Sequence, residues 1–194
     1  DDDEDVVALY LPSTYRAESE VARRLREMID AMPDTMATDL SAQIDELERV
    51  EGIAFHAQQR QAIETAVTSG MTVITGGPGT GKTTIVNGII QLFVDARAKV
   101  LMAAPTGRAA KRLSEATGEP AQTLHRMLMY SPEHGFYHCE DQKLTAEVLL
   151  VDEVSMLDAG LFLALLRALP VTCRLILVGD VNQLPSVGAG NVLA

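Results

Sequence analysis

A glycine-rich segment, GGPGTGKT at residues 76–83, constrains the fold of this chain more than any other feature. An apolar run at residues 71–75 precedes it, and a run with helical character at residues 84–97 follows it. This pattern between a strand and a helix predicts a P-loop, because glycines let successive backbone N–H groups turn toward an anion. The helix adds its own free N–H groups and the positive end of its dipole. The segment therefore predicts a polyphosphate site.

The residue types of the segment predict how such a ligand is held. Lys82 would reach the outer phosphates as a point charge, and the Thr83 hydroxyl would bind Mg²⁺. The alternative is a glycine-rich turn without a ligand, which the strand and helix on either side make less favourable. The predicted nucleotide-binding residues of this segment are Gly77, Pro78, Gly79, Thr80, Gly81, Lys82, Thr83 and Thr84.

Two later apolar runs end in polar residues that suit the same site. Residues 149–153, LLVDE, predict a strand followed by Asp152, a ligand for Mg²⁺, and Glu153, which would take a proton from the attacking water. An acidic helix start is the alternative interpretation. Residues 174–183, RLILVGDVNQ, end at Gln183, whose amide can donate and accept and so could sense the γ-phosphate. An ordinary strand-to-loop transition is the alternative there.

Two further groups predict contacts with a base and with nucleic acid. Gln58 and Gln59 precede the glycine segment by one helix, and an amide there could pair with adenine; a solvated helix face is the alternative. A basic cluster follows the second strand and could grip phosphates on the side away from ATP, or could be a solvated basic face. Its residues are Pro105, Thr106, Arg108, Lys111, Arg112, Thr123, His125 and Arg126.

The order of elements predicts an α/β fold. We expect strands at residues 71–75, 99–104, 147–151 and 174–178, and helices at 55–69, 84–97, 106–117, 122–130 and 159–169. Continuous apolar strands that alternate with helices predict a three-layer fold around a parallel sheet, with the site at the carboxyl ends of the strands. Helices at residues 13–32, stopped by Pro33, and 39–50 would form a small helical lead-in. Residues 131–143 fit either a short β-hairpin or a loop.

Composition and net charge indicate which classes of protein this chain can belong to. The chain has 194 residues, a net charge of −11 and 47% apolar residues, which suits a folded domain and argues against a general nucleic-acid coat. The run of acidic residues at positions 1–5 predicts a disordered tail. We expect no membrane segment and a cytoplasmic location, because no apolar run is long enough and only Cys139 and Cys173 occur. His134, His138 and Cys139 lack a fourth ligand, so zinc is not expected.

Taken together, the motifs resemble the RecD-like branch of superfamily-one DNA helicases. The matching pieces are FHAQQRQAI, TGGPGTGKTT, AAPTGRAAKRL, QTLHRML, LLVDEVSM and LVGDVNQLPSVGAGNVL, which occur in the family order over roughly residues 55 to 193. The family includes the RecD subunit of exodeoxyribonuclease V, stand-alone RecD-like helicases and conjugative relaxase–helicases.

The resemblance implies a RecA-like P-loop motor that binds ATP and Mg²⁺ and moves 5′-to-3′ on single-stranded DNA. Carried over by position, Gln59 would contact adenine. Lys82, Glu153 and Gln183 would be catalytic. Pro105, Thr106, Arg108, Thr123 and His125 would lie along DNA, and the segment near Phe136 sits where relatives carry a strand-separating pin.

The same resemblance sets the expected domains and partners. Residues 1–53 would be the lead-in, and residues 54–194 a RecA-like domain that ends just after the motif around Gln183. The expected partners are single-stranded DNA, a second RecA-like domain with an arginine finger, and RecB/RecC-like subunits. Without that finger we expect the 194 residues to bind ATP but to turn it over very slowly. A non-catalytic scaffold subunit and a relaxase helicase domain are the alternatives. A transporter ATPase or a kinase is less favoured, because neither an LSGGQ-like signature nor an arginine-rich lid occurs.

Overall fold

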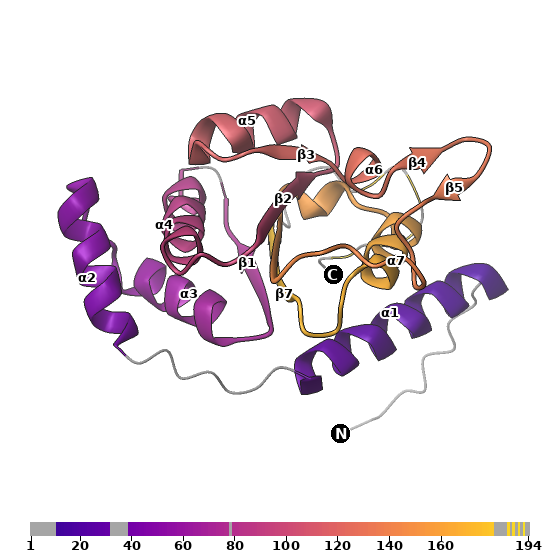
Figure 1. Ribbon diagram of the computed structural model, residues 1–194, viewed down its shortest axis with the longest axis horizontal. Helices are drawn as coiled ribbons and strands as arrows, with labels where there is room; N and C mark the ends of the chain where they lie inside the picture. Colours follow the sequence, from indigo (N-terminus) through magenta and orange to yellow (C-terminus); the bar gives the residue numbers. More distant parts are fainter. Residues whose placement is uncertain are drawn as a thin grey trace, which may run out of the picture.

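The computed structural model describes residues 11–31, 39–77, 79–180, 186, 188, 190 and 192. Its centre is a five-stranded sheet in the order β1-β7-β6-β2-β3, in which all strand pairs are parallel (Figure 1). The strands are β1 (Met71–Thr75), β2 (Val100–Ala104), β3 (Ala121–Thr123), β6 (Val148–Val151) and β7 (Arg174–Gly179). Parallel pairing places all five carboxyl ends at one edge of the sheet.

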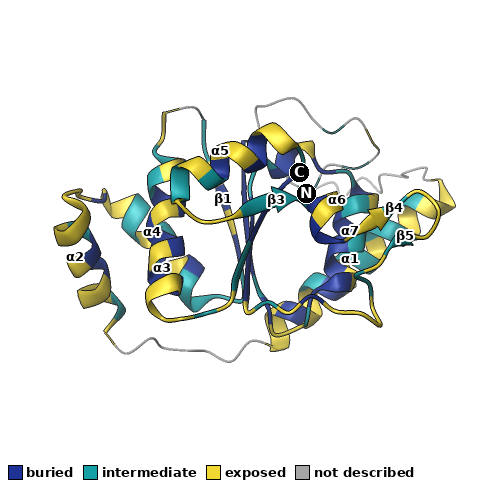
Figure 2. Ribbon diagram, turned by 45° about the horizontal axis from the view of Figure 1, so that its top comes forward, coloured by how far each residue is buried: buried dark blue, intermediate teal, exposed yellow. Residues whose placement is uncertain are grey.

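Helices cover both faces of this sheet. One face packs against α3 (Ala57–Thr68), α4 (Lys82–Asp95) and α5 (Gly107–Thr117). The other face packs against α1 (Pro12–Ala31), α6 (Leu124–Met127), η1 (Val154–Met156) and α7 (Ala159–Ala168). The most buried residues follow the strands between the two helical layers (Figure 2). The predicted α/β three-layer fold is therefore confirmed.

Strand β6 is apolar along its whole length because both of its faces are covered. Alternate residues of β6 enter opposite cores: Leu149 and Val151 face the layer of α7, whereas Val148 and Leu150 face the layer of α4. All four residues of this strand are buried. A strand buried on both sides has no exposed positions that could carry polar residues, so its sequence does not alternate.

Most helix ends fall within two residues of their expected positions, and local chemistry explains them. Gly52 and Gly118 end α2 (Leu40–Glu51) and α5 in the left-handed region that glycine tolerates. The Asp158 carboxylate accepts from the Leu161 backbone N–H at 2.8 Å and so caps α7. These signals are local in the sequence, which is why the boundaries could be predicted.

The expected helix over residues 122–130 is wrong. Ala121–Thr123 instead pairs with β2 as the edge strand β3, and only one helical turn, α6, follows. The Thr123 hydroxyl accepts from the Arg126 backbone N–H at 3.3 Å, so it starts the turn instead of lying inside a helix. Pairing with a distant strand outweighed the local helical pattern.

Residues 130–136 form the β-hairpin that was one of the two expected alternatives. Strand β4 (Tyr130–Ser131) pairs antiparallel with β5 (Gly135–Phe136). The Tyr130 ring lies 4.9 Å from that of Phe136 and 5.5 Å from that of His125, measured between centroids. The hairpin therefore packs against the His125 side chain of α6, the short helix that follows β3.

The lead-in helices pack on opposite layers of the molecule. Helix α1 lies along α7 and contributes the buried Met28, and α2 lies beside α4 and contributes the buried Ile44 and Leu47 (Figure 1). The boundary at residue 53 stays a prediction. The acidic segment 1–5 and Pro33 lie outside the described residues.

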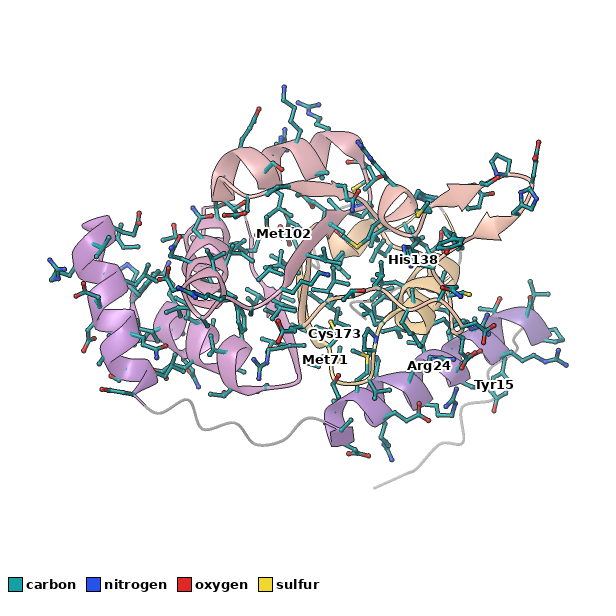
Figure 3. The ribbon with its side chains drawn as sticks, viewed as in Figure 1. Tyr15, Arg24, Met71, Met102, His138 and Cys173 are labelled. Atoms are coloured by element: carbon teal, nitrogen blue, oxygen red, sulfur yellow. The ribbon has the colours of Figure 1, made fainter. Side chains whose placement is uncertain are left out.

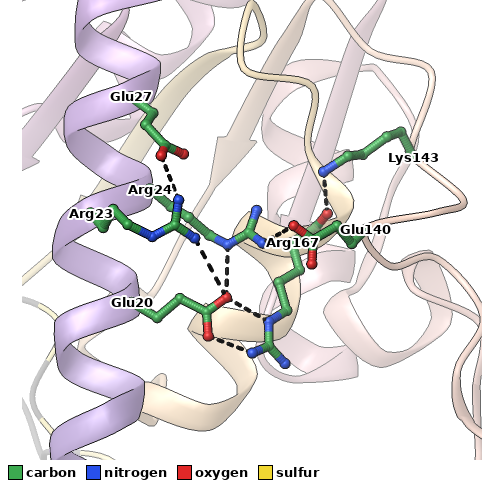
Figure 4. A network of polar contacts seen from close by, with 7 residues as sticks. All are labelled: Glu20, Arg23, Arg24, Glu27, Glu140, Lys143 and Arg167. Atoms are coloured by element: carbon green, nitrogen blue, oxygen red, sulfur yellow. Dashed lines mark hydrogen bonds and ion pairs between the residues drawn. The ribbon is translucent and has the colours of Figure 1, made fainter.

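A network of ion pairs holds α1 onto α7 (Figure 4). The Glu20 carboxylate accepts from Arg24 Nε at 3.0 Å and from Arg167 Nε at 2.9 Å. Arg24, only 7% exposed, also donates to Glu140 at 2.5 Å, and Lys143 donates to the Arg167 carbonyl at 2.5 Å. The hydrogen bond from Arg167, together with that from Arg24, lowers the pKa of Glu20 to about 2.

Both cysteines are free thiols, and Cys173 is a core residue as expected (Figure 3). Burial raises the pKa of its thiol to about 12, so it stays protonated and unreactive. No helix among the described residues is long and apolar enough to cross a membrane.

We predict that Glu20→Gln lowers the free energy of unfolding by on the order of 1 kcal/mol at pH 7, because it leaves the buried Arg24 with a weaker partner. The pKa of Glu20 is lower in the folded chain than its ordinary value of 4.5. Its contribution is therefore complete above about pH 4.5 and is lost as the pH falls toward 2. Urea unfolding from pH 7 to pH 3 should show the two proteins converging, with Glu18→Gln as the control. A difference that persists unchanged at pH 3 would contradict this assignment.

Candidate functional site

A cavity of about 460 Å³ opens at the carboxyl edge of the sheet. Its lining comes from the loop after β1, the start of α4, the ends of β6 and β7, and one side of α5. The sequence-predicted residues that meet in it are Gly77, Gly79, Gly81, Lys82, Thr83, Asp152 and Glu153. Residues from two segments separated by about seventy positions thus share one site, as the parallel sheet requires.

The loop curls around the Lys82 ammonium group. Lys82 Nζ donates to the carbonyl oxygens of Gly76 and Gly77, the second at 2.9 Å. The Thr80 hydroxyl also donates to the Gly77 carbonyl, at 2.9 Å. Two donor groups therefore make three hydrogen bonds to two loop carbonyls, and these bonds hold the chain in a closed turn with the lysine at the cavity wall.

Gln59 connects the start of α3 to the same loop. Its side-chain carbonyl accepts from the His56 backbone N–H at 2.9 Å, and its amide nitrogen lies 3.5 Å from the Thr80 carbonyl oxygen. Gln58 and Gln59 line a second cavity of about 450 Å³ behind the loop, which Lys82 also borders. The glutamine pair is therefore placed beside the loop, and its contact with a base stays a prediction.

The two carboxylates follow β6 in a strained turn. The Asp152 carboxylate accepts from the Glu153 backbone N–H at 2.9 Å, and Glu153 itself has φ 55°. A left-handed conformation costs a non-glycine residue of this kind roughly 1 kcal/mol, so surrounding contacts must hold it. The turn directs both side chains into the cavity that contains Lys82.

Burial gives these acids a raised proton affinity. It raises the pKa of Asp152, while the Glu153 N–H and Lys82 act in the opposite direction. Burial and the neighbouring Asp152 raise the pKa of Glu153, against the attraction of Lys82 and Arg112. A cation placed between the two acids would relieve their mutual repulsion, which makes this pair suited to a metal-bound ligand.

Arg112 is the residue whose position sequence reasoning misjudged. It was grouped with Arg108 and Lys111 as a basic face, but it lines the cavity and acts on Glu153. Lys111 instead points outward and pairs with Glu115 at 3.6 Å. The signal was present, because residues 112, 113 and 116 fall on one helical face, and Leu113 and Ala116 line the same cavity.

Other predicted residues fall elsewhere. Thr84 lines a separate cavity of about 430 Å³ between α2, α4 and the end of α5. Pro78 and Gln183 lie outside the described residues. No three His, Cys, Asp or Glu side chains among the described residues are grouped to hold a metal by themselves.

The predicted DNA contacts lie at the carboxyl ends of the neighbouring strands β2 and β3. Thr106 caps α5 by accepting from the Ala109 N–H at 3.2 Å, and Thr123 caps α6 in the same way. Arg108 and His125 are exposed beside them, whereas Pro105 is half-buried. The structure brings these five residues to one edge, with two hydroxyls already used as caps.

Comparison with known proteins identifies the family. A family model described as an AAA domain matches residues 59–189. The chain belongs to this AAA domain family. The chain is also similar to the ATP-dependent RecD2 DNA helicase of Deinococcus radiodurans: the two are 38% identical over 182 residues, which cover 94% of this chain and 25% of that protein.

Two further proteins are similar to this chain, one in sequence and one in fold. The RecBCD enzyme subunit RecD of Mycolicibacterium smegmatis is 37% identical, over 96% of this chain and 37% of that protein. Pif1 helicase from Candida albicans shares the fold, with a TM-score of 0.52 and 24% identity over 70% of this chain and 34% of that one. The chain thus spans about a quarter to just over a third of the relatives that it matches.

We predict that Gly81→Ala destabilises the fold by about 1 kcal/mol or more. Gly81 has φ 83°, and an added Cβ would lie 2.3 Å from the Gln59 amide nitrogen. Gly77→Ala is the matched control, because nothing lies within 4 Å of its added Cβ and its φ is not positive. Thermal unfolding should separate the two variants, and equal midpoints would refute this role of Gly81.

Proposed function

We propose that this chain is the ATP-binding motor segment of an ATP-dependent DNA helicase of the RecD-like family. The observation that carries the proposal is the shared cavity, in which Lys82, Thr83, Asp152 and Glu153 meet in a chain with RecD-like relatives. In this proposal the loop and Lys82 bind the β- and γ-phosphates, and Gln59 selects adenine.

The residues present also fit Mg²⁺. Thr83 and Asp152 supply a hydroxyl and a carboxylate oxygen to one cavity, and hard oxygen ligands are what this ion prefers. When bound with the nucleotide, the ion would neutralise charge that develops on the phosphates. Glu153 would accept a proton from the attacking water, while Arg112 stabilises negative charge across the cavity.

Single-stranded DNA is the proposed second ligand, along the edge formed by Pro105, Thr106, Arg108, Thr123 and His125. This edge lies beside the nucleotide cavity because α5 contributes to both: Arg108 stands near its start, and Arg112 lines the cavity. One rigid helix could therefore transmit a change at the phosphates to the bound strand. We propose 5′-to-3′ movement by analogy with the family, with Gln183 coupling the γ-phosphate to this motion.

We further propose that turnover and unwinding need a second RecA-like domain that supplies an arginine finger, and that RecB/RecC-like subunits are possible partners of the parent protein. The support is that the matched relatives are about three to four times as long as the aligned chain, and that one is a RecBCD subunit. An arginine finger typically contributes 10³-fold or more to turnover.

We predict that Lys82→Ala weakens Mg-ATP binding by at least roughly tenfold, because a charge-assisted contact with the phosphates is lost. Isothermal titration of the 194-residue chain measures this directly. Lys111→Ala is the control, since this lysine is exposed and lies outside the cavity. The nucleotide assignment fails if the folded wild type produces no saturable heat, or if both variants bind like the wild type.

We predict that Glu153→Gln separates binding from turnover. In a longer chain that includes the second motor domain, ATP turnover should fall by about 10²-fold or more, because the amide cannot accept the proton. Nucleotide affinity should change less than about threefold. Single-turnover hydrolysis and nucleotide titration give the two quantities. Unchanged turnover would show that another group is the base.

A further inference from the structure

A groove between α2 and α4 lies apart from both proposed ligand sites. Its volume is about 650 Å³, larger than that of the phosphate cavity. We call it the acidic groove, and it runs beside Leu47 and Val50 of α2 and Leu92 of α4. At the end of α4 it is lined by Gln91, Leu92, Asp95 and the following Ala96, at the opposite end of the helix from Lys82. An occupant could therefore bind there without entering the phosphate cavity.

The groove combines an apolar floor with a negative rim. Leu47 and Leu92 are buried at 6% and 7% exposure and form the floor, while Val50 on the wall is 63% exposed. Four carboxylates surround this floor, from Asp39, Glu46, Glu51 and Asp95. No lysine or arginine occurs among the described residues that line it.

Part of this negative charge is left uncompensated. Glu46 is held by Arg49 on the same helix at 2.6 Å, whereas the partner of Asp95 within the described part of the chain is the neutral Gln91 amide, at 2.9 Å. Asp39 and Glu51 form no ion pair among the described residues. A cation that entered the groove would therefore meet carboxylates that it could bind without breaking an existing salt bridge.

Helix α2, which forms one wall of the groove, is attached to α3 through Arg60. Arg60 of α3 binds Asp45 at 2.6 Å, Glu48 at 3.4 Å and the Ser41 carbonyl at 2.9 Å. These contacts lie on the inner side of α2, where Ile44 is fully buried. The inner carboxylates of α2 are thus used to attach the helix, and the outer ones line the groove.

We propose that the acidic groove is the docking site for a basic amphipathic helix of a partner protein. Its apolar residues would cover Leu47, Val50 and Leu92, and its lysines or arginines would face the four carboxylates. Nucleic acid and anionic membranes carry the same sign of charge as the rim and are repelled. A small hydrophilic cation would leave the Val50 side chain exposed to water. Helix α2 has twelve residues, a length of about 18 Å, which matches roughly three turns of a partner helix.

The test uses a defined probe, a fluorescein-labelled 14-residue helical peptide of leucine and lysine with one apolar face. The 194-residue chain should bind it saturably and 1:1, and a peptide with glutamate in place of lysine should not bind. Glu51→Lys combined with Asp95→Lys should weaken binding by at least about tenfold, because two attractions become repulsions. Glu119→Lys combined with Glu133→Lys changes the net charge equally at exposed sites elsewhere and should change the affinity less than about twofold.

Two milder variants test whether any loss of binding comes from unfolding, and they separate the apolar contribution to binding from the electrostatic one. Glu51→Gln with Asp95→Asn keeps the shape of the groove and should weaken binding several-fold, and Val50→Ser should weaken it at high salt as well. Hydrogen exchange should show protection by the peptide on α2 and at the end of α4. Failure of the peptide to bind, equal loss in the charge-matched control, or protection confined to other elements would overturn the proposal.

Two further measurements test whether something other than a basic helix occupies the groove. Binding of a poly-dT oligonucleotide or of phosphatidylglycerol vesicles that the groove variants abolish would overturn the assignment to a basic helix. Self-association in sedimentation experiments that the same variants abolish would instead assign the groove to a second copy of this chain. The Lys82→Ala variant should bind the peptide like the wild type, so a failure of the nucleotide assignment can be told apart from a failure here.

Discussion

The parallel register of the sheet is the constraint on which the rest of the structure depends. Because β1, β7 and β6 run in the same direction, the loop that contains Lys82 and the turn that contains Asp152 and Glu153 emerge at one edge. Between them, Gly179 at the end of β7 also lines the cavity. Opposite charges meet there because the paired strands β1, β7 and β6 hold the backbone, not because the side chains attract each other over a distance.

The nucleotide cavity with its two cations and the acidic groove lie at opposite ends of α4. The nucleotide cavity contains Lys82 and Arg112 against two acids, and Arg108 lies exposed near the start of α5. The acidic groove lies at the other end of α4. A chain with a net charge of −11 thus still brings Lys82, Arg108 and Arg112 to one edge of the sheet, while four carboxylates gather around the groove beside α2. In our proposals these two surfaces serve different partners.

Sequence reasoning worked where a signal is local. Gly118, Gly52 and Asp158 are terminators or caps whose effect is complete within one turn, and the helices and strands beside them were placed correctly. It failed at residues 122–130, where pairing of Ala121–Thr123 with β2 replaced the expected helix. It also grouped Arg112 with Lys111, because helical spacing shows which residues are neighbours but not which side of the helix faces a cavity.

The amino-acid sequence alone determined the glycine loop with its lysine, the two acids after a buried strand, and the alternation of strands and helices. These features follow from backbone freedom, charge and apolar periodicity, which each act over a few residues. Only the tertiary structure decided the strand order, the place of Arg112 beside Glu153, the attachment of α1 through Glu20 and Arg167, and the groove between α2 and α4. Each of these joins residues far apart in the chain, and such contacts depend on how whole faces pack against one another.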